Sequence, residues 1–287
     1  MKNLLTAAVV ISCFALFSCQ KEVNDIFSNT TNTGGNGNSA GLLVKTVSVT
    51  GTDSMITLYT YDNQKRLETM TMDGISNGMQ MHTYKKYIRD AGSRVSKVLQ
   101  VMEQNGLASD TSVERVHYPG SGMEFDYTVN PISISGLTVF DSTVYSYSSG
   151  KMISMLSNLT SPLLGPGILA RTKTDFAYDA SGNITVLKMY ADLGSGTLSP
   201  LMNQTYTYGA AINATWISTN SAQNFLLAGT PATGNKAFIK AQMDDLTDPS
   251  NSFTMTATYT LDAGNKPKSA MVTSTTGEVT KYTFYYQ

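Results

Sequence analysis

Apolar and polar residues alternate with a period of two along most of the chain after residue 42. Clear examples are the segments from Leu58 to Tyr61 and from Thr174 to Tyr178, in which aromatic residues occupy every second position near the end. Asp follows each segment, then a few polar residues, and then a new apolar alternation. Because this alternation is typical of a strand with one buried face, we expect each such unit to form a β-hairpin.

A turn signal closes these units and recurs about every thirty residues, the kind of spacing that marks a repeat architecture. Asp at the start of a turn accepts a downstream amide, and Gly adopts the left-handed conformation that short hairpin loops need. The signal occurs at Tyr61-Asp62, Arg89-Asp90, Tyr118-Pro119, Tyr147-Ser148, Tyr178-Asp179, Tyr208-Gly209 and Leu261-Asp262. The last interval is close to two periods, which indicates that an insertion replaces one copy.

The hairpin geometry also predicts cross-strand partners. Tyr145 and Tyr147 should face Met152 and Ile153 across the turn at 148–150. Pairs of this kind stabilise a sheet by about 0.2–1 kcal/mol each. We interpret the paired aromatic residues as sheet packing, with a stacking platform for sugars as the alternative.

Seven hairpins and a C-terminal strand give about 14–16 strands, more than an open twisted sheet holds before it curls, splits or closes. Consecutive hairpins favour an up-and-down order. The predicted fold is therefore all-β, a large up-and-down antiparallel barrel-like or rolled sheet built from repeated β-hairpins. A barrel this wide leaves interior space that strand side chains alone do not fill.

Two apolar segments are candidates to fill that space. The first is a loop around 163–169, and the second runs over 210–250, where the Gly and Pro content predicts a loop with at most a short helix. Either segment packs into the concave face, or it is exposed and contacts a membrane or a partner. The candidate contact residues are Leu163, Leu164, Ile168, Leu169, Trp216 and Phe225.

The N-terminus has the pattern of a lipoprotein signal peptide over residues 1–18. Lys2 precedes an apolar run that is shorter than the roughly 20 residues of a membrane-spanning helix. Cys19 follows Ser18 directly, in the position where a lipobox places the cysteine that is acylated and becomes the mature N-terminus. Lys21 and Glu22 then resemble a sorting signal that sends lipoproteins to the outer leaflet of the outer membrane.

Residues 19–41 are predicted to be a lipidated cysteine and a flexible polar tether. The stretch 28–41 has no large apolar side chain, so it cannot bury enough surface to offset the entropy of ordering. A single β-hairpin-repeat domain is expected over 42–287. The expected location is the outer membrane, lipid-anchored and exposed at the cell surface, with the lipid as the contact to the membrane.

Short motifs carry a family resemblance. The sequence from Phe176 to Gly182 resembles the Tyr-Asp repeats of large wrapped β-sheet shells, although the period here is longer. The stretch from Phe253 through Leu261-Asp262 to Tyr285 looks like a Bacteroidetes surface lipoprotein family of unknown function. That resemblance implies a porin-like β fold behind a lipobox and a polar tether, and it supplies no catalytic residues. The chain departs from the repeat pattern at Arg89, where Tyr is expected, and at Gly209, where Asp is expected.

Charge and candidate chemistry narrow the functions. Lys and Arg total 20, Asp and Glu total 21, and neither sign is clustered, which argues against a nucleic-acid partner. The two histidines, His82 and His117, lie on different predicted hairpins without a cysteine or carboxylate cluster, so neither a metal site nor a cofactor is predicted.

Three functions remain open. The first is a non-catalytic, surface-anchored β module that binds a glycan, a peptide or an envelope protein through its concave face or its loops. The second is an accessory structural subunit of an outer-membrane complex. The third is a glycan-acting enzyme, which would need two carboxylates about 5–10 Å apart; Glu68, Glu114 and Glu124 are candidates for such a pair.

Overall fold

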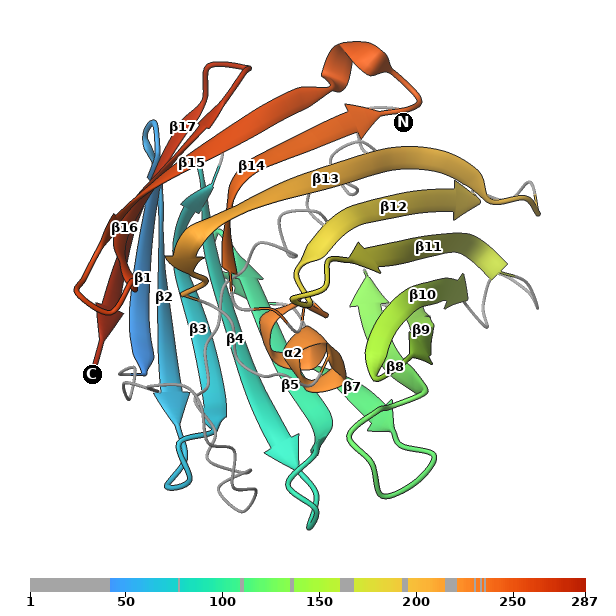
Figure 1. Cartoon of the computed structure of the whole chain (residues 1–287). Helices are drawn as coiled ribbons and strands as arrows, with labels where there is room; N and C mark the ends of the chain where they lie inside the picture. The colour runs from blue at the N-terminus through green and yellow to red at the C-terminus, as the bar shows by residue number, and fades with distance from the viewer. Residues whose placement is uncertain are drawn as a thin grey trace.

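The structure, a computed structural model, describes residues 42–287 except 77, 109–110, 135–136, 161–167, 193–195, 215–220, 230, 233 and 235. The described residues form one antiparallel sheet of seventeen strands that closes on itself (Figure 1). All strands except the two-residue β6 belong to the ring, which is therefore a sixteen-stranded up-and-down barrel. The predicted fold class is confirmed. The sequence did not decide between a closed barrel and a rolled sheet, and the structure shows the closed barrel.

The strands in chain order are β1 (Leu43–Thr50), β2 (Asp53–Tyr61), β3 (Leu67–Ser76), β4 (Met79–Arg89), β5 (Val95–Gln104), β6 (Leu107–Ala108), β7 (Ser112–His117), β8 (Tyr127–Ile134), β9 (Leu137–Ser148), β10 (Lys151–Thr160), β11 (Ile168–Tyr178), β12 (Ile184–Asp192), β13 (Ser199–Ile212), β14 (Lys236–Asp245), β15 (Phe253–Leu261), β16 (Pro267–Ser274) and β17 (Val279–Tyr286). The helices are α2 (Ser221–Ala228) and the short 3₁₀ helix η3 (Pro249–Asn251).

The last strand closes the ring by pairing with the first. β17 and β1 are in register from Leu43 opposite Tyr286 to Thr50 opposite Thr280. The backbone amide of Gln287 also donates to the carbonyl of Leu42. The barrel therefore has no free sheet edge, which removes the unpaired strand that an open sheet of this size would present.

The two ends of the barrel differ. The turns with the Tyr-Asp signal all lie at one end, which we call the closed end, together with the first residues of β1 and the last residues of β17. The loops that follow β1, β3, β5, β8, β10, β12, β14 and β16 lie at the other end, which we call the open end. Chain entry and chain exit therefore share the closed end.

The long interval between the last two turn signals has a different cause from the one expected. Strands β14 and β15 occupy the interval, so no repeat copy is missing. A single repeat is instead lengthened by the connection 213–235, which carries α2. The expectation of a loop across all of 210–250 was wrong for β14, whose alternation is weak because its buried residues are the small Ala237 and Ala241.

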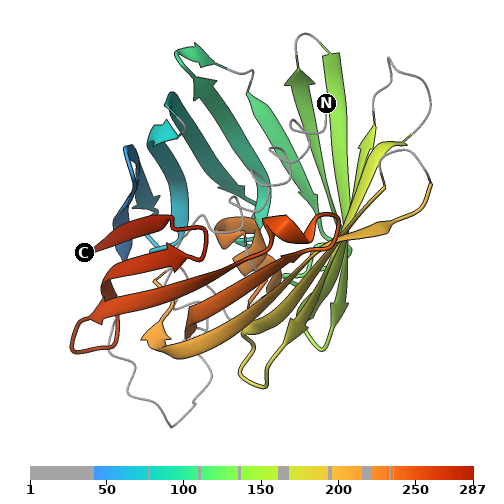
Figure 2. The ribbon, with the colours of Figure 1, turned by 90° about the horizontal axis from the view of Figure 1, so that it is seen from above.

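The core lies inside the barrel and is concentrated near the closed end. One cluster of buried side chains centres on Phe125, Met152 and Leu187, and another centres on Leu67, Met70 and Val95. The helix α2 lies within the ring of strands, as seen along the barrel in Figure 2. It contributes Ala222 to the first cluster and Leu227 to the second.

A β-bulge recurs where strands leave the closed end. In the pair β9–β10, Tyr147 faces Met152 as predicted, but the bulge at Ile153 makes Tyr145 face Met155. Ile153 is turned to the outside and is 39% exposed. The expected partnership of Tyr145 with Ile153 was wrong because one extra residue in a strand moves the next side chain to the opposite face.

Candidate functional site: the lumen of the barrel

Each bulge at the closed end leaves a backbone carbonyl without a ladder amide, and a side chain from the neighbouring strand supplies the missing donor. We call this hydrogen bond a latch. Seven latches are present: Tyr61 to Leu43, Arg89 to Leu67, Tyr118 to Val95, Tyr178 to Met152, Tyr208 to Ile184, Tyr259 to Phe238, and Tyr286 to Pro267.

Each latch joins two strands that the chain connects only at the open end. β12 and β13, for example, are connected there, and the Tyr208 hydroxyl donates to the carbonyl of Ile184 at the closed end over 2.6 Å. The latches therefore fasten the far ends of these strand pairs around the closed end. The exception is the pair β8–β9, where the Tyr147 hydroxyl is buried near the Phe125 backbone without a hydrogen bond of ordinary geometry.

Arg89, the departure from the Tyr pattern, performs the same task. Its Nη2 donates to the carbonyl of Leu67 over 3.1 Å, and its Nη1 donates to the carbonyl of Ser93 over 3.2 Å. The repeat thus requires a long side chain with a terminal donor, and both a phenol and a guanidinium satisfy it.

The Asp that follows the latch residue organises the turn. Asp62 Oδ1 accepts the amides of Gln64 and Arg66, and Asp90 and Asp179 make equivalent bonds within their own turns. Partial burial works against ionisation of Asp62, but the hydrogen bonds and the Arg66 charge outweigh it and lower the pKa of this carboxyl. The pKa values of Asp90 and Asp179 are lowered for similar reasons.

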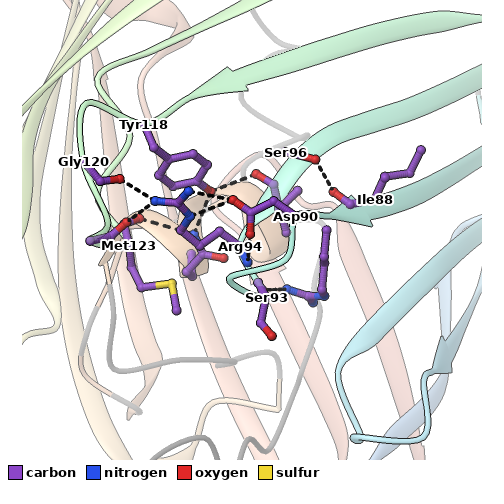
Figure 3. Close-up of polar contacts among 12 residues, drawn as sticks. Ile88, Asp90, Ser93, Arg94, Ser96, Tyr118, Gly120 and Met123 are labelled. Carbon is purple, nitrogen blue, oxygen red and sulfur yellow. Dashed lines mark hydrogen bonds and ion pairs between the residues drawn. The ribbon is translucent and has the colours of Figure 1, made fainter.

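Arg94 links this turn system to the helix (Figure 3). Its guanidinium pairs with Asp90 at 2.7 Å, lies 4.4 Å from the ring centroid of Tyr118, and donates to the carbonyl of Gly120. Gln223 of α2 donates from Nε2 both to the Tyr118 hydroxyl and to the carbonyl of Met123. Burial raises the pKa of Tyr118 to about 12, so its hydroxyl stays protonated as a donor.

The helix α2 packs between the walls and obstructs the closed end. Phe225 makes an edge contact with Tyr145 at 5.5 Å between ring centroids. Asn224 is fully buried and donates from Nδ2 to the carbonyl of Ala232. The two alternatives for this segment were packing into the concave face and exposure, and Phe225 packs inward.

The inward face becomes accessible to solvent toward the open end. Met102 shares the inward face with its cross-strand partner Thr83, which is buried, yet Met102 is 46% exposed. Met55 and Met81 also point inward on neighbouring strands and are partly exposed. The barrel is thus a cup, with a packed floor at the closed end and a lumen that solvent enters from the open end.

Polar groups cross the inner wall above the floor, on β4 and, beyond β5, on the consecutive strands β7, β8, β9 and β10. We call this group the lumen belt; it consists of Lys85, Glu114, Asn130, Asp141 and Ser157. Lys85 shares the inward face with buried Met70, and Glu114 shares it with buried Val98. Asn130 and Asp141 are cross-strand partners, and the Ser157 hydroxyl donates to Asp141.

The barrel wall surrounds the charged members of the belt. Enclosure lowers the pKa of Lys85, and attraction to Glu114 opposes that change only in part. Enclosure likewise raises the pKa of Glu114, against a hydrogen bond from Thr128 and the attraction of Lys85. Each side chain nevertheless keeps part of its surface accessible.

The outer wall mixes charged residues with exposed apolar ones such as Leu58, Val144 and Met271. Arg115, Lys188 and Lys281 are exposed near the middle of β7, β12 and β17, and Lys173 pairs with Asp175 on β11. A membrane-spanning barrel has an apolar outer band and a polar interior, and Lys or Arg at mid-membrane depth costs about 2–4 kcal/mol. Charged side chains at these mid-strand positions interrupt such an apolar band here, although exposed apolar residues lie beside them. Separately, no helix among the described residues is long and apolar enough to cross a membrane.

Several residues singled out from the sequence are not described. Cys19, Lys21, Glu22, Leu163, Leu164 and Trp216 lie outside the described residues, and Ile168 and Leu169 belong to β11 without a described side chain. The signal peptide, lipidation and sorting of residues 1–41 therefore remain predictions.

The other candidate chemistry is scattered. His82 lies 2.5 Å from Asp73 and His117 lies 2.6 Å from Asp126, both pairs on the outer wall. No group of three potential metal ligands occurs among the described residues. Of the three glutamates named above, Glu114 lies in the lumen, whereas Glu68 is nearly half exposed beside Lys86 and Glu124 is exposed.

Lys85, Asn130, Asp141 and Ser157 were not predicted from the sequence as polar residues of the inner wall. The available signal was the alternation of side chains along a strand, which shows the face on which each residue lies. Lys85 lies two residues from Thr83 and two residues from Tyr87, which are both buried. Because every second residue of a strand lies on the same face, Lys85 points inward as they do.

Comparisons with known proteins agree with the fold. A scan against protein-family models found no match, and a search of curated proteins found none. Among solved structures, a porin-like protein from Bacteroides uniformis aligns with 86% of this chain and 98% of its own, at 11% identity and a TM-score of 0.51. A porin-like protein from Bacteroides vulgatus aligns with 85% and 98% respectively, at 12% identity and a TM-score of 0.49. The molecule belongs to the class of closed up-and-down β-barrels, and the porin-like fold that the resemblance implied is confirmed.

Proposed function

We propose that this protein is a non-catalytic, lipid-anchored cup of the outer membrane that holds a ligand in its lumen. The observation that carries the proposal is the asymmetry of the barrel: α2 and the two buried clusters fill one end, and inward side chains such as Met102 are exposed toward the other. A wall with charged residues at mid-strand on its outer face suits a receptor held at the membrane by a lipid better than a pore within it.

The position of chain entry supports an orientation. The barrel begins at Leu43, at the closed end, so a tether from Cys19 would reach this end. The closed end would then face the membrane, and the open end would face away from it, toward ligands in the surroundings. Two or more acyl chains suffice for stable anchoring, so the barrel itself need not enter the bilayer.

A membrane-wash experiment tests the proposal. The full chain and its Cys19→Ser variant are expressed in a Gram-negative host, and membranes are washed with alkaline carbonate. We expect the natural chain to stay with the outer membrane and the variant to be released in folded form. Retention of the Cys19→Ser variant in the washed outer-membrane fraction, away from the inner membrane where an uncleaved signal peptide would hold it, would show that the barrel inserts by itself, and the proposal would fail.

Cell-surface exposure has its own test. A membrane-impermeant biotin ester applied to intact cells should label outer-wall lysines such as Lys188 and Lys281, which are exposed. Labelling that occurs only after lysis would place the cup on the periplasmic side instead.

An accessory structural role is the second candidate, and one observation favours it. Leu58 and Tyr285 flank Lys45 on the outer wall and are 44% and 46% exposed, with Ile56 and Val49 exposed nearby. A photo-crosslinking residue at position 58 that captures one protein in stoichiometric yield from native membranes would support this role. Capture of lipid or of nothing would count against it.

A further inference from the structure

The lumen belt carries a more specific inference, which rests on the proposed function. Four of its members come from the consecutive strands β7 to β10, and Lys85 comes from β4, on the other side of β5. Lys85 is attracted to Glu114, Glu114 accepts a hydrogen bond from Thr128 and is repelled by Asp141, and Asn130 faces Asp141 across the ladder. The belt is therefore a polar band that carries charges of both signs, on an inner wall that also holds uncharged polar residues such as Thr83, Thr128 and Thr143.

The hydrogen-bonding capacity of this surface is not used up within the chain. Lys85 and Glu114 attract each other, and no direct ion pair joins them among the described residues, so the ammonium donors of Lys85 are available to a ligand. Asn130 Oδ1 is buried and has no hydrogen-bond partner in the part of the chain that the structure describes. Buried polar groups without partners are rare in folded proteins and call for an explanation, of which a ligand is one.

The signs of the charges restrict the ligand. An anionic ligand placed at Lys85 would also meet Glu114 and Asp141, and a cationic ligand placed at the carboxylates would also meet Lys85. A hydroxyl group both donates and accepts, so it can satisfy a carboxylate, an ammonium and an amide oxygen in turn. A surface with both signs side by side therefore favours a neutral ligand with many hydroxyl groups.

Apolar inward residues beside the belt suit the apolar C–H faces of such a ligand. Met102 is exposed toward the lumen near the open end, and Met155 lies inward beside Tyr145 on the far side of the belt. Thioether side chains are flexible and polarisable, so they adapt to apolar C–H faces of irregular shape. We infer that the lumen belt is the binding site for a neutral, hydroxyl-rich ligand of the saccharide class.

The test is calorimetric titration of the detergent-solubilised full chain. The probes are neutral hexasaccharides of gluco, manno, galacto and xylo configuration, with hexagalacturonate and hexalysine as charged counterparts. We expect saturable binding of at least one neutral probe. Glu114→Gln combined with Lys85→Met should weaken it about tenfold or more, because charge-assisted hydrogen bonds are lost.

The matched control changes the same residue types on the outer face of the adjacent strand. Lys97→Met combined with Glu103→Gln alters side chains that point outward on β5 and should leave the affinity within about twofold, as expected for surface changes away from a site. Asp141→Asn is a second lumen variant, and it keeps the volume of the side chain. Thermal unfolding of every variant separates loss of binding from loss of fold.

The inference would be overturned by silence of every neutral probe, by tighter binding of a charged counterpart, or by neutral binding that the lumen variants leave unchanged. Each of these outcomes leaves the membrane-wash result intact, so failure of the ligand class is distinguishable from failure of the anchored cup. Hydrolysis of a bound probe would keep the saccharide site and refute the non-catalytic part of the proposed function.

Discussion

Replacement of Tyr208 by Phe removes the donor of one latch and keeps the ring. The Tyr208 hydroxyl donates to the carbonyl of Ile184 over 2.6 Å, and Ile184 is 6% exposed. The bulge at this position leaves the Ile184 carbonyl without a substitute donor from the ladder. The variant therefore loses a hydrogen bond and also leaves a buried acceptor unsatisfied.

The magnitude follows from these two terms. A hydrogen bond contributes a net of about 0.5–1.5 kcal/mol, and an unsatisfied buried acceptor raises the loss to about 1–3 kcal/mol. For a domain of this size, each kcal/mol lowers the melting temperature by about 2–4 °C. We expect Tyr208→Phe to lower the free energy of unfolding by about 1–3 kcal/mol, with an unchanged urea dependence.

The assay is equilibrium urea unfolding followed by tyrosine fluorescence and far-ultraviolet circular dichroism, on chain expressed without residues 1–19. Tyr285→Phe is the matched control, because that hydroxyl belongs to an outward side chain that is 46% exposed. The control should change stability by no more than about 0.5 kcal/mol. Equal effects of the two variants would show that the phenol at position 208 acts by packing alone, and the latch would lose its physical basis.

Three further predictions follow from the closed end and the lumen. Arg89→Tyr should fold with nearly natural stability, whereas Arg89→Leu should lose about 1–3 kcal/mol in the same urea assay, because only the first retains a donor for Leu67; equal losses would contradict the latch. The free energy of unfolding should hold from neutral pH down to about 4 and fall at lower pH. The reason is that the folded-state pKa values of Asp62 and Asp90 are lowered, so the stability these carboxylates contribute is lost as the pH falls through those values. An acid titration of melting temperature that stays flat below about pH 4 would refute this. Met102→Cys should react rapidly with a maleimide from the open end while Met70→Cys, at a position that is 1% exposed, reacts only on unfolding; mass spectrometry measures both rates, and equal protection would mean that the lumen is filled.

The turn signals were informative because they act locally. Asp62 and Gly182 shape their turns with bonds and dihedral angles that lie within a few residues, so the sequence alone placed most hairpins correctly. The long interval after Tyr208 gave a wrong expectation for the number of repeats, because one repeat is lengthened and none is lost. The length of the interval alone does not distinguish these two cases.

The bulges and the latches had no local signature of their own. The side-chain period in a strand shows which residues share a face, but an extra residue such as Ile153 reverses that assignment without changing composition. The latch from Tyr178 to Met152 joins residues far apart in the chain, so its purpose became visible only when both strands were in place.

The sequence by itself determined the strand-forming segments, the antiparallel hairpins and the fold class, because alternation and turn chemistry are short-range properties of the chain. Only the tertiary structure decided that the sheet closes between β17 and β1, that α2 obstructs one end, and that Lys85, Glu114 and Asp141 share a single inner wall. These features depend on the accumulated twist and stagger of sixteen strands, and a contact between residues on different hairpins is set by that sum rather than by any one segment.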